Sequence, residues 1–248
     1  MLSLEKMPKL DVGDHSLDIY FESEDYGPKK VGTVYVEKKF TFNGRVSDSD
    51  SRAVDTRFVL KSGDYMEEFS TDSRGVFSRR MVPDEYGFDL FFPKGELTLS
   101  EVELERNFSG NINYHYFDKP NTLDIDLKGI KPVNMMTVSF GYPFDAGTAR
   151  MSYNPAKMDD PAQADVFECV EWNFWARECI SGWDKIDSEA VQIRPTDWTA
   201  RFPVTPVKTS EYGDEKQVLY SAYVVGTNSK LEVSRIGVND YRVASNGN

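Results

Sequence analysis

The loop VSDSDSRAVD, residues 46–55, holds the side chains best suited to bind a metal ion. Asp48, Asp50 and Asp55 offer hard oxygen ligands of the kind that calcium prefers. The loop lacks the glycine and the terminal glutamate of an EF-hand, and three carboxylates fall short of the roughly six to eight oxygens that calcium takes. Asp and Ser also favour turns by bonding their own backbone. The segment is therefore either a calcium site or an ordinary turn.

A second candidate site lies in the tryptophan-rich part of the chain. The four tryptophans are Trp172, Trp175, Trp183 and Trp198. Alternation along a strand places Trp172 on one face with Phe174, which is typical of core packing, and Trp175 on the other face with Glu171 and Asn173. For the cluster as a whole, packing in the core is the favoured interpretation. Because aromatic faces stack on sugar rings, the rival interpretation is a carbohydrate contact at Trp175, Asn173 and Glu171.

The two cysteines are ten residues apart in FECVEWNFWARECISGW. If the segments around Cys169 and Cys179 form a hairpin, their sulfur atoms can meet in a disulfide. Two buried thiols, or a reactive or metal-binding pair, are the alternatives. A zinc site would need further ligands, and His15 and His115 lie far away in the sequence.

No pattern of residues indicates catalysis. The sequence contains no Gly-x-Ser-x-Gly elbow, glycine-rich phosphate loop or His-Glu-x-x-His pair. Alternation in the strand around Tyr114 and Tyr116 places His115 on the opposite, solvent-facing side. We therefore predict a protein that is not an enzyme, and keep as an alternative a hydrolase with a carboxylate pair near residues 144–165.

Asn107-Phe108-Ser109 is a sequon for N-glycosylation. Modification at Asn107 would require both an exposed position and export from the cytoplasm.

Composition limits the class of protein and of partner. The 248 residues include 13 Tyr and 16 Phe, which suit the half-buried faces of strands. A net charge of -12 and a pI near 4.7 exclude nucleic acid as the expected partner, because phosphate binding needs clustered Lys and Arg. No run approaches the roughly 20 apolar residues of a membrane span.

Strand patterns occur along nearly the whole chain, which predicts an all-β protein. Val102 and Leu104 alternate with acidic residues, whereas residues 134–142, 167–175 and 217–226 are apolar on both faces and predict central strands of antiparallel sandwiches. Turn formers recur at the spacing expected of a sandwich. Residues 144–165 show little alternation and predict a long loop, in which Asp160-Pro161 could start one helical turn.

Residues 40–92 follow a characteristic order of strands and turns. A strand ends in Gly44-Arg45-Val46, a second runs from Val54 to Leu60, and a Gly63-Asp64 turn precedes Thr71 to Ser78, Pro83 and Tyr86. This order resembles the carboxypeptidase regulatory-like, or transthyretin-like, β-sandwich family. The resemblance implies a β-sandwich over residues 1–96, with extra N-terminal strands, in a cell-envelope or secreted protein and without catalysis of its own.

Residues 97–248 resemble a second kind of module. Tyr114 to Phe117, Leu123 to Ile130, Trp183 and Tyr220 to Gly226 are similar to the strands of β-sandwich modules in archaeal secreted and surface-layer-associated proteins. The two resemblances together imply two consecutive antiparallel β-sandwich domains, 1–96 and 97–248.

These observations predict a non-catalytic structural or adhesion module, extracellular or at the cell surface, of an archaeal or other prokaryotic protein. A carbohydrate-binding module attached to a secreted enzyme is the alternative. The start MLSLEKMPKL lacks the apolar core of an export signal, so the chain is either cytoplasmic or an ectodomain whose signal and membrane anchor lie outside this sequence. The resemblances favour the ectodomain, with a cell-envelope protein or a glycan as its partner.

Overall fold

The computed structural model describes residues 13–23, 26–82, 84–104, 108–123, 125, 127, 129–194, 196–211 and 214–228. The described chain is built of strands, with three single-turn 3-10 helices, η1 (Pro120–Thr122), η2 (Pro155–Lys157) and η3 (Pro161–Gln163). The all-β, sandwich-type fold class is thereby confirmed. None of its helices has the length and apolar character needed to span a membrane.

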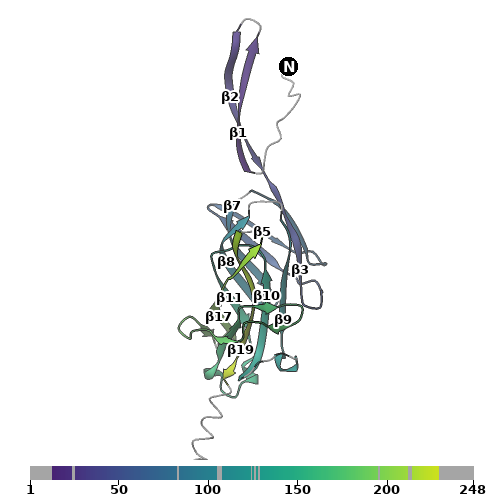
Figure 1. Ribbon diagram of the computed structural model, residues 1–248, viewed down its shortest axis with the longest axis vertical. Coiled ribbons are helices and arrows are strands. Elements are labelled where there is room, and N and C mark those ends of the chain that lie inside the picture. The colour runs from purple at the N-terminus through teal and green to yellow at the C-terminus, as the bar shows by residue number, and fades with distance from the viewer. Residues whose placement is uncertain are drawn as a thin grey trace, which may run out of the picture.

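Two large sheets make up the body of the protein (Figure 1). The first has eight strands, in the order β15-β12-β19-β10-β9-β3-β6 with β18 paired to β19. Its strands are β3 (Phe40–Ser47), β6 (Val76–Met81), β9 (Phe108–Phe117), β10 (Ile130–Phe140), β12 (Asp165–Cys169), β15 (Asp184–Lys185), β18 (Val207–Glu211) and β19 (Asp214–Asn228).

The second sheet has seven strands, in the order β16-β17-β11-β8-β7-β4-β5. Its strands are β4 (Arg57–Ser62), β5 (Tyr65–Ser70), β7 (Asp84–Phe92), β8 (Gly95–Leu104), β11 (Ala146–Ser152), β16 (Gln192–Arg194) and β17 (Thr199–Pro203).

Aromatic side chains join the two sheets in one core. Phe42 of β3 meets Phe88 of β7 edge to face, with ring centroids 5.8 Å apart, and Phe92 of β7 stacks on Tyr114 of β9 at 4.2 Å. The buried cluster to which these rings belong runs through both sheets, from Phe40 to Val225. Edge-to-face and offset rings of this kind stabilise a core beyond their burial alone.

The division into consecutive domains 1–96 and 97–248 is wrong for this chain. The predicted boundary falls inside β8, which pairs with β7 along its length. Both sheets take strands from each side of that boundary, and so does the core. The strands of residues 40–92 cannot close a sandwich alone, because they are divided between the two sheets and leave apolar faces that only later strands cover.

One pair of parallel strands joins a strand from the first part of the chain to a strand from the later part. β3 runs parallel to β9, with Gly44 opposite Gly110, whereas neighbouring ladders such as β10 with β19 and β4 with β7 are antiparallel. A Cβ atom on Gly44 would lie 1.9 Å from the carbonyl oxygen of Gly110. Glycine is therefore required at position 44 by the closeness of the neighbouring backbone.

The predicted loop 144–165 contains a central strand. Its first part forms β11, which lies between β8 and β17. Ala149 and Met151 are buried and alternate with Thr148 and Arg150, so the alternation is present but carried by small and charged residues. The rest forms η2 and η3, and Asp160 caps η3 by accepting from the Ala162 amide, as the Asp160-Pro161 pattern predicts.

The strands predicted to be apolar on both faces lie at the centre of the first sheet. In β10 the neighbours Met135 and Met136 are both buried, and in β19 so are Tyr223 and Val224. One face meets the second sheet, and the other is covered by a smaller cluster that includes Phe167, Trp172 and Phe174. Residues 170–183 therefore form a cover on the outer face of the first sheet.

Strands β1 (Gly13–Ser23) and β2 (Tyr26–Lys38) form a long antiparallel hairpin, here called the arm. The arm projects from one end of the sandwich (Figure 1) and pairs with neither large sheet. The extra N-terminal strands implied by the sequence are therefore present, but they extend away from the sandwich.

Candidate functional site

The predicted carbohydrate site lies on a short hairpin in the cover of the first sheet. Strands β13 (Trp172–Asn173) and β14 (Glu178–Cys179) are joined by a turn over residues 174–177. Trp172 and Phe174 are buried, whereas Trp175 is 57% exposed and stands edge-on to the Phe174 ring. Glu171 and Asn173 are exposed as well. The hairpin thus presents one large aromatic side chain to solvent.

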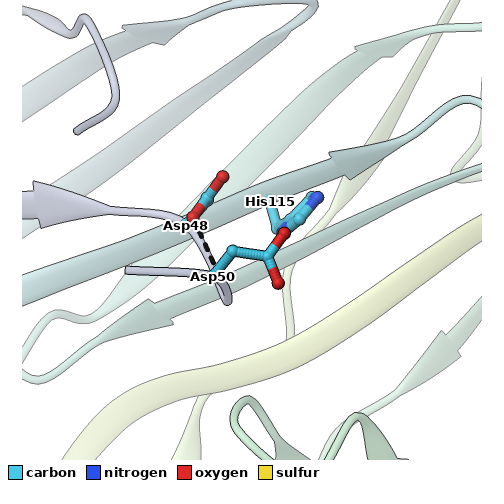
Figure 2. Close-up of side chains that lie close together, drawn as sticks. All are labelled: Asp48, Asp50 and His115. Atoms are coloured by element: carbon cyan, nitrogen blue, oxygen red, sulfur yellow. Dashed lines mark hydrogen bonds between the residues drawn. The ribbon is translucent and has the colours of Figure 1, made fainter. Parts of the chain in front are cut away.

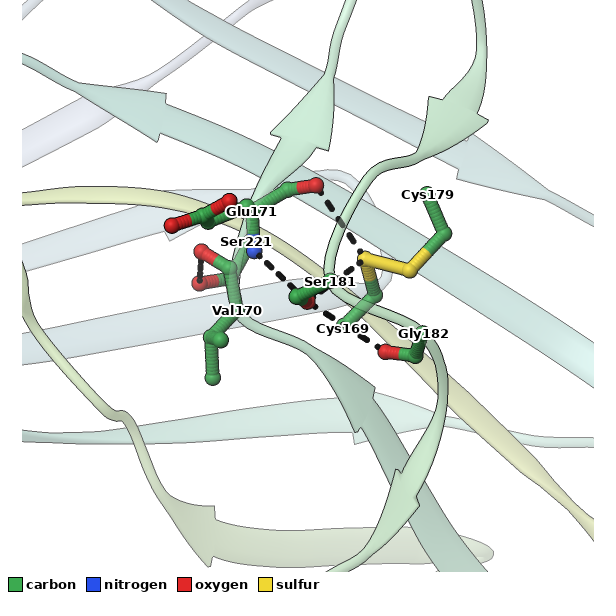
Figure 3. Close-up of a disulfide and its surroundings, with 7 residues drawn as sticks. All are labelled: Cys169, Val170, Glu171, Cys179, Ser181, Gly182 and Ser221. Atoms are coloured by element: carbon green, nitrogen blue, oxygen red, sulfur yellow. Dashed lines mark hydrogen bonds between the residues drawn. A yellow bond between two sulfur atoms is a disulfide. The ribbon is translucent and has the colours of Figure 1, made fainter.

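A disulfide fixes the base of this hairpin. Cys169, at the end of β12, is bonded to Cys179 of β14, with the two Cα atoms 5.9 Å apart, so the described chain contains the predicted bridge and no free thiol. Figure 3 shows the surroundings: the Glu171 amide donates to Ser181 Oγ at 3.3 Å. Cys169 is fully buried, so the hairpin is anchored in the first sheet.

Arg177 fixes the other end of the hairpin. Its backbone is left-handed, with φ of 55°, which turns its side chain toward the loop after β3. Its Nε donates to Ser49 Oγ at 3.1 Å, and its guanidinium forms an ion pair with Asp50. The guanidinium carbon also lies 5.7 Å from the centre of the Phe117 ring. Cation–π contacts of this kind add to the ion pair, so the turn is tied to two parts of the sandwich.

A groove runs beside the exposed tryptophan. Its volume is about 420 Å³, and it is lined by Ile125, Ala176, Arg177, Glu178, Cys179, Gly182 and Trp183. An aromatic ring, an arginine and a carboxylate in one groove give the mixture of apolar wall and few polar groups that is typical of ligand sites. Sequence reasoning missed Arg177, Glu178 and Trp183 as site residues, because only the folded hairpin and the segment after it bring them together.

The acidic loop after β3 brings together a different set of ligands from the one predicted. Ligand atoms of Asp48, Asp50 and His115 lie within 4.8 Å of one another, and Figure 2 shows the three side chains. Asp55 is not in this group. The loop closes before it, because Ser47 pairs with Ala53 and the Val54 amide donates to the Val46 carbonyl. The expected set Asp48, Asp50 and Asp55 is therefore wrong in its third member.

Protein groups already occupy the ligand atoms of this cluster. Asp48 Oδ1 accepts from the amides of Asp50 and Arg52, at 2.9 and 2.8 Å. His115 Nδ1 accepts from the Ser49 amide at 3.2 Å and lies 2.6 Å from Ser49 Oγ. Calcium takes roughly six to eight oxygens, whereas this group offers two carboxylates and a nitrogen. The geometry therefore fits a structural role better than a calcium site: hydrogen bonds and an ion pair hold the loop, β9 and the hairpin together.

His115 is half-buried rather than fully exposed on a wet face. Its ring stacks on Phe117 with centroids 3.9 Å apart, which removes water from one side of the imidazole. Burial lowers the pKa of His115 below its ordinary value, and the nearby Asp48 carboxylate opposes this effect. A neutral ring with an unprotonated Nδ1 is also the form that accepts the Ser49 amide hydrogen.

Two pairs of carboxyl groups stand out electrostatically. Burial raises the pKa of Glu168, and Asp184, opposite it on β15, raises this pKa further, while the Thr205 hydroxyl lowers it. A hydrogen bond with Asp145 raises the pKa of Glu101. A raised pKa in a cleft marks candidate acids, but neither pair lines the groove beside Trp175.

One predicted residue lies outside the described part of the chain. Asn107, the acceptor of the glycosylation sequon, is at a position that the structure does not describe. Its modification remains a prediction from the sequence.

The sequence matches no protein-family profile and no curated protein. Among solved structures, a DUF3823 family protein from Bacteroides ovatus is similar over 77% of this chain and 99% of its own length. The two sequences are 12% identical and the TM-score is 0.25. A likeness at this level carries no argument about function.

Proposed function

We propose that this chain is a non-catalytic adhesion module of the cell surface that binds glycans through Trp175. The observation that carries the proposal is the position of this side chain, 57% exposed on a turn that is fixed at both ends. A single exposed aromatic side chain needs no explanation by itself, so the proposal rests on Trp175 together with the groove beside it and the two contacts that fix its turn.

The rigidity of the hairpin supports binding rather than incidental exposure. The disulfide holds β14 to β12, and Arg177 holds the turn to Asp50 and Ser49. A ring held in its bound position loses little conformational entropy when a ligand arrives, and this preorganisation increases affinity. Sugar rings present one face of C–H groups that suits a flat indole.

Polar groups beside Trp175 supply hydrogen bonds for sugar hydroxyls. The side-chain oxygen of Asn173 accepts from the Ala176 amide, which directs it to the turn and leaves the amide hydrogens as donors. Glu171 and Glu178 are exposed acceptors, and Arg177 and Glu178 line the adjoining groove. The hairpin therefore combines a stacking surface with both donors and acceptors.

The disulfide supports an extracellular location, because such bonds persist in oxidising compartments. The resemblance of residues 40–92 to regulatory-like sandwiches, and of the later strands to archaeal surface modules, supports the same location and a role without catalysis. A partner in the cell envelope would then be a glycan or a glycosylated protein.

A glycan array, followed by titration of tryptophan fluorescence, tests this proposal. We expect one class of glycan to bind the wild-type protein and to bind Trp175→Ala about tenfold more weakly, a loss of roughly 1.4 kcal/mol. The matched control is Tyr35→Ala, which removes another exposed aromatic side chain and should leave affinity unchanged. The proposal fails if no glycan binds, or if Trp175→Ala binds as well as the wild type.

The arm favours a second candidate function, that of a structural module joined to another copy of this chain. Leu17 lies opposite Val34 on one face of the ribbon, which Ile19 and Phe21 continue. Ile19, Phe21 and Val34 are exposed. An isolated two-stranded ribbon is marginally stable in water. In a symmetric dimer, the apolar face of each arm would cover the same face of the other arm.

Sedimentation at rising protein concentration tests this second function. We expect a dimer that dissociates in the double variant Ile19→Ser/Phe21→Ser and persists in Trp175→Ala. A wild-type protein that remains monomeric at all concentrations would exclude assembly through the arm.

A further inference from the structure

A second groove lies on the outer face of the second sheet, across strands β8, β11, β17 and β16. Its volume is about 280 Å³. Three arginines, Arg150, Arg194 and Arg201, line it together with one carboxylate, that of Glu96. Basic side chains therefore outnumber acidic ones in this groove, whereas in the whole chain 41 acidic residues outnumber 29 basic ones.

Strand register places two of these arginines directly opposite each other. Arg150 of β11 is the cross-strand partner of Arg201 of β17. Like charges in this position destabilise a sheet, so the fold itself gains nothing from the pair. On its other side Arg150 faces Glu96 and donates to it, with Nε 2.8 Å from Oε2.

The other two arginines have no carboxylate partner among the described residues. Arg201 donates to the hydroxyl of Thr148 at 3.3 Å. Arg194 is exposed, and no described acidic group pairs with it. Two unneutralised guanidinium groups therefore point into one groove of an acidic protein, beside the hydroxyls of Thr98 and Thr148.

The groove continues into a neighbouring one of about 230 Å³, with which it shares Arg150 and Thr199. This second groove adds the side chain of Phe91, on which Arg57 stacks, and Lys94, whose ammonium is paired with Asp118. The cations thus form a track across several strands, which is longer than a single small anion needs.

We propose that this track binds a polysaccharide whose sugars carry carboxylate groups, such as a polyuronate. The planar fork of arginine matches a carboxylate through two parallel hydrogen bonds, and threonine hydroxyls suit the sugar hydroxyls between successive charges. The overall charge of -12 opposes any polyanion, nucleic acid included, so binding rests on the local arginines of the track and not on a broad positive field. The track does not include the Trp175 hairpin. Failure of the proposed glycan site would therefore not count against the proposed uronate site.

Fluorescence anisotropy with a labelled oligogalacturonate tests the proposal, with an uncharged oligosaccharide of equal length as the comparison. We expect the uronate to bind, the neutral sugar not to bind, and affinity to fall as salt rises from 50 to 200 mM, about the range over which ion-mediated binding weakens strongly. Arg201→Gln and Arg194→Gln should each weaken binding about tenfold. Glu96→Gln should strengthen it, because the variant removes a competing carboxylate.

Arg80→Gln is the matched control, since it removes an exposed arginine of the first sheet and changes the net charge equally. It should bind the uronate like the wild type, as should Trp175→Ala. The proposal is overturned if Arg80→Gln weakens binding as much as Arg201→Gln, if a single-stranded oligonucleotide binds as tightly as the uronate, or if the correctly folded wild type binds no uronate. Circular dichroism and thermal melting of each variant confirm the fold.

Discussion

At the scale of single residues, His115 connects the stability of the protein to pH. Its ring accepts the Ser49 amide hydrogen and is held neutral by burial, which lowers its pKa below the ordinary 6.5. In the unfolded chain the same group takes up a proton near that ordinary value. The unfolded state therefore binds more protons over the interval just below pH 6.5, and the native state loses stability as pH falls through it.

We expect the free energy of unfolding in urea to fall between pH 7.5 and 5.5 more steeply for the wild type than for His115→Gln. Glutamine can accept the same hydrogen bond but does not titrate, so the difference between the two slopes isolates the imidazole. Parallel pH dependences would show that His115 is neutral in both states or charged in both.

The residue scale also shows how much of the candidate site can be predicted from sequence. Alternation places Trp172 and Phe174 in the core and Trp175 in solvent, because the hairpin keeps period two up to its turn. Alternation cannot exclude Asp55 from the predicted metal site, since the Ser47–Ala53 bridge that closes the loop before it has no sequence signature. The arginine groove is equally hidden, because its lining residues come from four strands whose order follows from the fold.

At the scale of elements, the parallel pairing of β3 with β9 depends on Gly44. A methyl group there would meet a backbone oxygen at 1.9 Å, and a backbone atom cannot turn away as a side chain can. We expect Gly44→Ala to destabilise the protein by roughly 2 kcal/mol or more, as overpacking of a dense core does, measured by chemical denaturation.

Gly32→Ala is the control for this prediction, because nothing lies within 4 Å of a Cβ atom at position 32 of the arm. It should change stability by less than about 0.5 kcal/mol, as surface changes generally do. Equal effects of the two substitutions would contradict the close approach of β3 and β9.

The hairpin β13–β14 depends on its disulfide. Cys169 and Cys179 close a loop with a sequence separation of 10 residues, and removing such a cross-link costs roughly 2–3 kcal/mol through the entropy of the unfolded chain. We expect Cys169→Ser/Cys179→Ser to lower the unfolding free energy by that amount and to speed hydrogen exchange in residues 170–183. Unchanged exchange there would mean that Arg177 alone holds the turn.

The element scale also separates what local patterns can predict from what they cannot. Strands such as β10 and β19 are evident because both of their faces are buried and apolar. β11 is missed because its inward residues include Ala149 and its outward residues include Arg150, so its alternation resembles that of a polar loop. The disulfide could be anticipated from spacing, but its role in closing a cover over the first sheet could not.

At the scale of the whole molecule, the sandwich is one cooperative unit. Both sheets combine strands from the first 96 residues with later strands, and the core cluster runs from Phe40 to Val225. The sequence pattern of residues 40–92 does not reveal which strands pair with them, because pairing between distant strands leaves no local trace in a sequence.

We expect neither residues 1–96 nor residues 97–248 to fold when expressed alone. Each fragment would expose apolar faces that the intact chain buries. Two-dimensional NMR spectra and near-ultraviolet circular dichroism measure this directly. A dispersed spectrum from either fragment would contradict a shared core, whereas removal of residues 1–38 should leave the sandwich folded.

Because both sheets contain early and late strands, the sandwich cannot be completed until late in synthesis. A ribosome adding roughly 5–20 residues per second needs on the order of ten seconds or more to pass from β3 to β19, which is the central partner of β10. During that interval the aromatic side chains of β3, β4 and β7 have no complete surface to pack against. The nascent chain therefore exposes these apolar side chains until β19, the last described strand of the sandwich, emerges.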